Sequence, residues 1–323
     1  MSTVNEIAGA CDRTLPAKNS AGPAHAPAGR TATSLAQKVS PSERGPIFPA
    51  IPKTRLRALV VPREHGAWGM LLVPLICGGA VGLIRGGRIL PLLILLVAAM
   101  AAFWLRTPLE SWLGTTPLRA QTAKERRAVV VFMMAFAGIA GIALSALFRD
   151  GRNRLLLPLG AAVALAFIAQ AVLKKLSRKL RMAAQVAGAI GLTAAAPAAY
   201  CVATGRLDAT AAALWLANWL FAGDQIHFVQ LRMHAARAQS TGERVRRGRI
   251  FLMGQGALAA ALIASAKLGF LPWLALLAFV PVILRGMAWF ARSPQPLAVR
   301  RLGWSELAQC LLFGALLVAA FAL

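Results

Sequence analysis

The ionisable side chains of this sequence that could do chemistry among apolar residues fall into three groups. The first group opens the first apolar run, where Arg63, Glu64 and His65 are consecutive and Trp68 follows. Such acids and imidazoles can orient a polar headgroup, and a guanidinium can balance anionic oxygens. The alternative interpretation is an ordinary helix start, because Glu64 also suits the positive end of a helix dipole and Trp68 suits a membrane interface.

The second group follows the second apolar run and contains Arg106 and Glu110. Glu110 is the only acid between residues 65 and 125. It can orient a bound group, with Arg106 balancing the charge of that group. It can equally be a solvated loop acid that pairs with Arg106, four residues earlier on the same helix face.

The third group is the richest in polar side chains, which are Asn218, Asp224, His227, Gln230, Arg232 and His234. At 3.6 residues per turn, Asp224, His227 and His234 lie near one helix face, with Gln230 beside it. Asp224 can hydrogen-bond the His227 imidazole and select its tautomer. A structural polar pair near the membrane interface, or a helix that simply leaves the membrane, is the alternative.

The elements that carry these groups are expected to span a membrane. The chain has 323 residues, of which 58% are hydrophobic and 15% charged, and its mean hydropathy is +0.63. A soluble domain is about half apolar and a quarter charged, so the composition excludes a single water-soluble globule and a disordered protein. The four Cys show no motif spacing, which excludes a disulfide scaffold.

Nine apolar runs are long enough to cross a hydrocarbon core of about 30 Å, and they cover 66–84, 89–105, 128–148, 155–173, 182–203, 208–226, 250–266, 268–284 and 305–323. Because lipid requires every backbone polar group to have an internal partner, we predict an all-α bundle of about nine transmembrane helices. Glycines at 66, 69, 78, 79 and 82 favour close approach of neighbouring helices. Residues 1–59 lack any apolar period and predict a disordered, basic cytoplasmic tail before a transmembrane domain over 60–323.

The distribution of Lys and Arg predicts the orientation. If the N-terminus is cytoplasmic, 29 of the 36 Lys and Arg fall on cytoplasmic segments and 7 on the other side. This bias predicts that the C-terminus lies outside. The lipid bilayer is then the expected partner of the basic clusters, and no nucleic-acid partner is predicted despite the net charge of +25.

Two segments resemble a known family of bacterial membrane proteins. The segment VPREHGAWGMLLVPLICG at 61–78 resembles the opening signature of the YwiC-like family. The segment WLFAGDQIHFVQLRMHAARA, which begins at Trp219, stands where that family has a second polar, basic helix end. The resemblance covers about residues 60–323. It implies an integral protein of the bacterial inner (plasma) membrane and supplies no mechanism.

The layout also resembles the UbiA superfamily of membrane prenyltransferases, which have nine helices and two acidic motifs after helices 2 and 6. Residues 106–127 and 224–243 stand at those two places. The resemblance implies a cavity that binds an isoprenoid or other anionic lipid, with Mg²⁺ as the candidate cofactor. The chain departs from this pattern, because Glu110 stands alone at the first place and Asp224 comes a turn early at the second. The cofactor is therefore left unassigned and no metal ligand is predicted.

We predict that the three groups meet in one polar cavity that faces the cytoplasm. Four residues are the candidate catalytic groups, which are Asp224, His227, Glu110 and His65. Eight residues are the candidate substrate-binding groups, which are Arg63, Glu64, Trp68, Arg106, Asn218, Gln230, Arg232 and His234. The predicted function is a UbiA-like isoprenoid-binding protein or divergent prenyltransferase. The alternatives are a small-solute or proton-coupled transporter and a non-catalytic membrane partner protein.

Overall fold

The computed structural model divides the chain into two units, Met1–Lys53 and Thr54–Leu323. The structure describes residues 59–60, 65–113, 120–149, 152–177, 180–235, 238, 240–292 and 299–323, all of which belong to the second unit. The predicted N-terminal tail, apart from Leu59, lies outside the described residues. In the described part, the Ser111 hydroxyl donates to the Leu59 carbonyl oxygen, and Leu59 packs against Val129.

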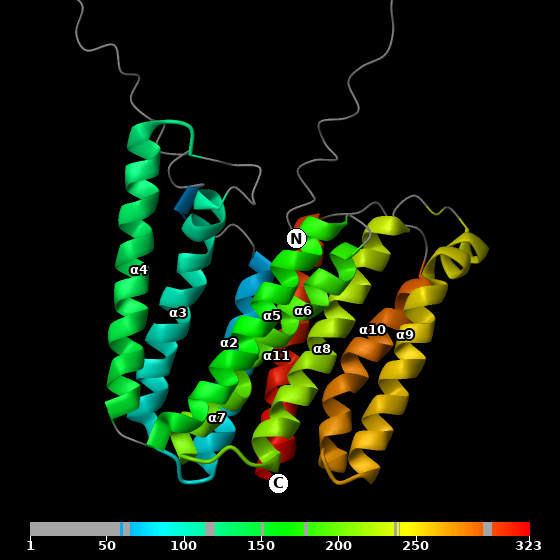
Figure 1. The fold of residues 1–323 in the computed structure, drawn as a ribbon. Coiled ribbons are helices and arrows are strands. Elements are labelled where there is room, and N and C mark those ends of the chain that lie inside the picture. The colour runs from blue at the N-terminus through cyan, green and yellow to red at the C-terminus, as the bar shows by residue number, and fades with distance from the viewer. Residues whose placement is uncertain are drawn as a thin grey trace, which may run out of the picture. The chain divides into compact units, whose positions relative to one another are not determined.

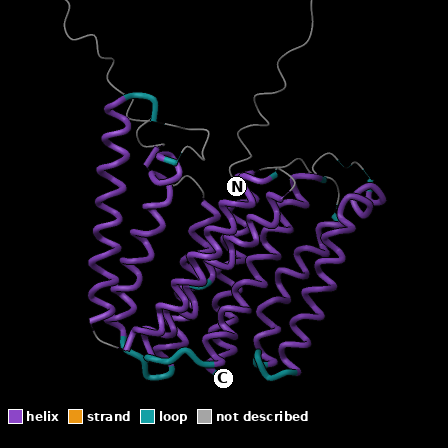
Figure 2. The backbone as a smooth tube through the Cα atoms, viewed as in Figure 1, coloured by secondary structure: helices purple, strands orange, loops and turns teal. Residues whose placement is uncertain are grey.

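The described part of the second unit is built from helices that short loops connect (Figure 1, Figure 2). In chain order the helices are α2 (His65–Ile84), α3 (Ile89–Trp112), α4 (Ala123–Arg149), η2 (Arg152–Leu155), α5 (Leu156–Leu176), α6 (Arg181–Thr193), α7 (Ala195–Thr204), α8 (Ala209–His234), α9 (Thr241–Lys267), η4 (Trp273–Phe279), α10 (Val280–Ala291) and α11 (Val299–Ala322). The elements η2 and η4 are 3₁₀ helices. Strands are absent from the described ranges, and the prediction of an all-α membrane bundle is confirmed.

Each of the nine predicted apolar runs coincides with a helix or a pair of helices. The run at 182–203 is a pair, α6 and α7, which meet at Ala194. Pro197 lacks an N–H and lies in the first turn of α7, where a helix leaves its N–H groups without intrahelical partners, so the break at Ala194 suits this residue. The run at 268–284 is the 3₁₀ helix η4 followed by α10. In the described part, seven spans are long and apolar enough to cross a bilayer.

Helix α8 is not among those seven spans, because polar side chains interrupt its apolar surface. It packs against α2, α6, α7 and α9. Asn218, Asp224 and Gln225 on α8 are buried in the protein. The neighbouring helices therefore shield from lipid the helix that carries most of the third group.

The core is centred where α8, η4 and α11 meet. The Phe313 ring stacks on the Phe221 ring with centroids 4.0 Å apart, and meets the Phe279 ring edge-on at 5.2 Å. Figure 1 shows α3 and α4 side by side on one side of this unit, and α9 and α10 on the opposite side. Helices α2, α8 and α11 lie between these two pairs.

Helices α2 and α7 cross at small residues. A Cβ atom at Gly78 would lie 1.9 Å from the Ala196 carbonyl oxygen, and one at Gly82 would lie 2.7 Å from the Ala203 Cβ. The prediction that these glycines allow close helix approach is confirmed. The backbone N–H of Arg88 also donates to the Ala203 carbonyl oxygen, which connects the loop after α2 to the end of α7.

The chain alternates between the two ends of the bundle. One end, which we call the basic end, contains Arg106, Lys174, Arg232, Arg244 and Arg292. The other end holds the loops after α2, α7 and α9, together with the C-terminus (Figure 1). The alternation that the Lys and Arg count assumed is therefore present in the fold.

Candidate functional site

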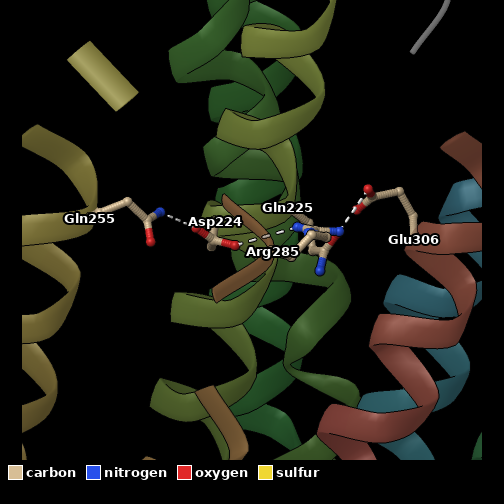
Figure 3. Close-up of polar contacts among 5 residues, drawn as sticks. All are labelled: Asp224, Gln225, Gln255, Arg285 and Glu306. Atoms are coloured by element: carbon tan, nitrogen blue, oxygen red, sulfur yellow. Dashed lines mark hydrogen bonds and ion pairs between the residues drawn. The ribbon is translucent and has the colours of Figure 1, made fainter. Parts of the chain in front are cut away.

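Five polar side chains from four helices meet inside the bundle. They are Asp224 and Gln225 on α8, Gln255 on α9, Arg285 on α10 and Glu306 on α11 (Figure 3). We call this group the Arg285 cluster. At 1.5 Å per residue, Asp224 lies about 15 Å along α8 from the last residue of that helix, His234. Arg285 and Glu306 lie about 9–11 Å along α10 and α11 from the ends of those helices at the basic end.

Arg285 joins the cluster together. Its Nη1 donates to Glu306 Oε1 at 2.7 Å and to Gln225 Oε1 at 3.3 Å. Its Nη2 forms an ion pair with Asp224 Oδ2 at 3.7 Å. The guanidinium carbon also lies 4.0 Å from the centroid of the Phe228 ring. One cation therefore connects an acid on α8 with an acid on α11.

Gln255 completes the cluster from α9, where its Nε2 donates to Asp224 Oδ1. The relative exposure is 6% for Asp224, 5% for Gln225 and 8% for both Gln255 and Glu306. Each of these four residues is therefore more than nine-tenths buried. Ionisable groups at such depth in membrane helices are costly and usually have a function.

Several buried polar atoms of this region have no hydrogen-bond partner among the described residues. They are Asp224 Oδ2, Gln225 Nε2, Gln255 Oε1, Arg285 Nε, Arg285 Nη2, Glu306 Oε2 and Gln309 Oε1. Nearly all buried polar groups in proteins have a partner, and an unmatched one costs about 1–3 kcal/mol. The cluster is therefore chemically suited to bind water or a polar ligand.

Several helices are longer than their apolar runs, and the extension of α10 places Arg285 within a helix. The predicted run at 268–284 left Arg285 in a loop, which is wrong, because α10 continues to Ala291. Helix α8 continues beyond the apolar run to His234, as the helical spacing of Asp224, His227 and His234 predicted. On α11, Glu306 and Gln309 are three residues apart, which places both on the same helix face.

His227 lies one turn from Asp224, at the contact between α8 and α9. A Cβ atom at Gly254 would lie 2.8 Å from His227 Nδ1. A Cβ atom at Gly286 would lie 2.8 Å from the Phe251 ring and 3.9 Å from Gln255 Cδ. Glycines therefore allow α8, α9 and α10 to approach closely around Gln255.

We expect Gly254→Ala to lower the free energy of unfolding by about 1–2 kcal/mol, because the new methyl group would overlap the His227 ring. Gly256→Ala is the matched control on the same helix, since a Cβ there meets nothing within 4 Å. That control is expected to gain up to about 1 kcal/mol from helix propensity. Thermal unfolding of the purified protein measures both changes. Equal midpoints for the two variants would show that the contact is not tight.

The other predicted residues of the third group have different partners. Asn218 Nδ2 donates to the Leu214 carbonyl oxygen at 2.8 Å within α8. Gln230 Nε2 donates to Gln185 Oε1 on α6 at 3.1 Å. His234 is exposed, with Nδ1 2.8 Å from the Gln230 carbonyl oxygen. Arg232 interacts electrostatically with Glu306 and Arg285, so it lies in the field of the cluster.

The second group forms its own cluster at the basic end. Glu110 Oε1 accepts from Arg106 Nε at 3.0 Å and lies 3.8 Å from Lys174 Nζ on α5. The Trp68 ring meets the Phe103 ring with centroids 5.0 Å apart, and Trp104 at 6.4 Å. These contacts join α2, α3 and α5. The pairing of Glu110 with Arg106 that the spacing suggested is present.

The described contacts do not join the second and third groups directly. The partners of Glu110 come from α3 and α5, whereas those of Asp224 come from α9 and α10, so the single shared cavity stays a prediction. Arg63 and Glu64 lie outside the described residues. His65 begins α2, and its side chain is outside the described part.

The described residues do not fit the Mg²⁺ site that the UbiA resemblance implied. Within these ranges, no three His, Cys, Asp or Glu side chains come together as a metal-binding group. A hard cation on a diphosphate needs several carboxylate oxygens around it, and the two acids at the expected places lie in separate clusters. We derive no chemistry through Mg²⁺.

The sequence interpretation missed Gln225, Gln255, Arg285 and Glu306. A usable signal was nevertheless present, because Arg285 and Glu306 are single charges of opposite sign next to long apolar runs. Arg285 is six residues before the last residue of α10, and Glu306 is seven residues after the first residue of α11, and both of these helix ends lie at the basic end. Opposite charges at matching depth are candidates for an ion pair across helices.

Comparison with known proteins adds one match. Residues 61–200 match the family model described as YwiC-like protein, and this range includes the opening motif at 61–78. No curated protein and no solved structure matches the chain. The residues of the Arg285 cluster, from 224 to 306, lie outside the matched range. The chain is therefore an integral membrane protein with several apolar helices, whose residues 61–200 match the YwiC-like family.

Proposed function

We propose that this protein is a membrane carrier that binds a small polar solute at the Arg285 cluster. One observation carries the proposal, which is the set of buried, unpartnered polar atoms contributed by four different helices. Ionisable residues inside transmembrane bundles commonly mark solute or ion pathways. Sites formed between separate helices also allow the helices to move relative to one another during transport.

The position of the cluster supports entry of the solute from the basic end. Arg285 and Glu306 are only about two helical turns from that end along their helices. Arg232 lies nearer the end of α8 and interacts electrostatically with Glu306. By the positive-inside rule, this end faces the cytoplasm of a bacterial inner membrane.

We expect a cysteine introduced at Gln225 to react with a small water-soluble methanethiosulfonate at least about tenfold faster than one at Ile142, because the reacting thiolate needs water. Both variants are made in the full chain with its four native Cys replaced by Ala. Ile142 on α4 is 74% exposed on the apolar surface of the bundle and serves as the lipid-facing control. Labelling rates in membranes are measured by mass spectrometry.

A labelling rate at position 225 no higher than that at position 142 would contradict the proposal. The cluster would then be a dry structural ion pair that holds α8, α10 and α11 together. Protection of the position 225 cysteine by an added solute would identify that solute as an occupant.

A UbiA-like isoprenoid-binding protein is the second candidate. The nine predicted apolar runs and the placement of Glu110 on α3 and Asp224 on α8 favour it. This candidate requires Glu110, whereas the carrier requires only the Arg285 cluster. Mass spectrometry of organic extracts from the purified protein distinguishes the two, because an isoprenoid lost from Glu110→Gln would favour the UbiA-like function.

A further inference from the structure

We infer that the Arg285 cluster binds a primary ammonium group between α8 and α9, at Asp224 and Gln255, and releases one proton in exchange. This inference rests on the proposed function and names the class of solute. It follows from three features of the cluster, namely its charge, the distances around Arg285, and the kinds of atoms that have no partner.

The cluster contains more negative than positive charge. It holds two carboxylates, Asp224 and Glu306, and one guanidinium, Arg285, which gives a formal charge of −1 when all three are ionised. An uncompensated charge in a buried site costs several kcal/mol. The site therefore favours the binding of one further positive charge, which is either a proton or a cation.

The distances place the missing positive charge at Asp224. Glu306 accepts a hydrogen bond from Arg285 at 2.7 Å and also interacts electrostatically with Arg232. Asp224 Oδ2 lies 3.7 Å from Arg285 Nη2, which is beyond hydrogen-bond distance. Figure 3 shows Asp224 and Gln255 on one side of the guanidinium and Glu306 on the other.

The unpartnered atoms of Asp224 and Gln255 are acceptors, whereas those of Arg285 and Gln225 are donors. Gln255 Nε2 donates to Asp224 Oδ1, so its Oε1 is left as an acceptor. Among the described residues, Gln255 Oε1 and Asp224 Oδ2 have no hydrogen-bond partner. A primary ammonium carries three N–H donors and one positive charge, which match these oxygens. A quaternary ammonium has the charge but no donor, and an anion would meet the carboxylate.

The charged and titratable groups around this position are few in the described part. On α8 they are His227, one turn from Asp224, and Arg232, two turns away. From α10 and α11 they are Arg285, Glu306 and the buried thiol Cys310. On α9 the residue next to Gln255 is Gly254, against the His227 ring. Among the described groups, only Arg285 forms an ion pair with Asp224.

The exchange balances in atoms and charge. Without a solute, Asp224 holds a proton as a neutral carboxylic acid, and the Arg285–Glu306 pair is neutral. An incoming ammonium, R–NH₃⁺, binds to the carboxylate as the O–H bond of Asp224 breaks and the proton leaves to water. No electrons are transferred, and the cluster remains neutral before and after binding.

The test uses the full chain in detergent with n-butylammonium as the probe. Tetramethylammonium and butyrate are the comparators, and the measurements are the thermal unfolding midpoint and proton release to a pH indicator. We expect only butylammonium to raise the midpoint, with one proton released per molecule bound. Its affinity is expected to fall about tenfold for each unit of pH decrease, because one proton competes for the same carboxylate.

Asp224→Asn is expected to abolish both the midpoint shift and the proton release. Glu243→Gln is the control, because Glu243 lies at the start of α9 and forms its ion pair with Arg247. If Asp224→Asn does not fold, Asp224→Glu is measured, and it must retain the proton release. The comparison of the three probes on the unmodified protein needs no variant.

An equal effect of tetramethylammonium, a larger effect of butyrate, or butylammonium binding without proton release would overturn this inference. If position 225 is labelled rapidly while butylammonium has no effect, the solute class is wrong and the proposed carrier function stands. If position 225 is not labelled, the proposed function itself fails.

Discussion

Replacing Arg285 with methionine is expected to lower the free energy of unfolding by about 3–5 kcal/mol, because removing one partner of a buried ion pair leaves the other charge uncompensated. Here the single change leaves the Glu306 carboxylate, in a residue that is only 8% exposed, without the Arg285 cation, and it removes the cation nearest to the buried Asp224. Methionine retains most of the apolar stem, so the loss comes from charge rather than from packing. Thermal or denaturant unfolding of the protein in detergent measures the effect.

Arg301→Met provides the matched control, because Arg301 is exposed on α11. Its effect is expected to stay within about 0.5 kcal/mol, as for most surface substitutions. Adding Asp224→Asn and Glu306→Gln to Arg285→Met should restore most of the lost stability, since the buried charges are then removed together. If the triple variant is no more stable than Arg285→Met, the stability lost in Arg285→Met does not come from uncompensated buried charge.

The second large effect is expected at the crossing of α2 and α7. Gly78→Ala should lower the free energy of unfolding by about 3 kcal/mol, because overpacking against an unyielding neighbour forces the backbone to shift. The new Cβ would lie 1.9 Å from the Ala196 carbonyl oxygen and 2.9 Å from its Cα. These are backbone atoms of a helix, so no side-chain rotation can remove the overlap.

Gly79→Ala is the control on the adjacent residue of the same helix. Its Cβ would meet only the Leu92 side chain, at 3.4 Å and beyond, which is ordinary contact. We expect that variant to be neutral or up to about 1 kcal/mol more stable, since alanine has the higher helix propensity. The unfolding midpoints of Gly78→Ala and Gly79→Ala, measured in the same detergent, test this prediction. A Gly78→Ala protein as stable as Gly79→Ala would show that α2 and α7 are further apart than described.

The helical spans could be predicted from the sequence because lipid acts on each residue locally. A run of about 20 apolar residues must form a helix whatever its neighbours are, since only internal hydrogen bonds satisfy its backbone in lipid. The nine predicted runs accordingly coincide with helices, and the family resemblance at 61–78 agrees with the match over 61–200. The ends were less predictable, because polar residues continue α8 and α10 beyond their apolar parts.

The candidate site could be predicted only in part. Asp224 was found because an acid within an apolar run is conspicuous, and it lies in the Arg285 cluster. Glu110 was found because it is the only acid between residues 65 and 125, yet its described partners are Arg106 on α3 and Lys174 on α5. Arg285 and Glu306 were passed over because each stood at a run boundary, where a charge is ordinary.

The amino-acid order by itself determined that the chain is a helical membrane protein, which segments form its apolar helices, and that most Lys and Arg lie in the segments at one end. Those properties depend on hydropathy and charge along the chain, and each residue contributes to them independently. Only the tertiary structure decided that Asp224 meets Arg285 and Gln255 rather than Glu110. Which helix faces meet depends on packing between residues far apart in the chain, such as Gly78 with Ala196 and Phe221 with Phe313. A count of residues along one helix cannot contain that information.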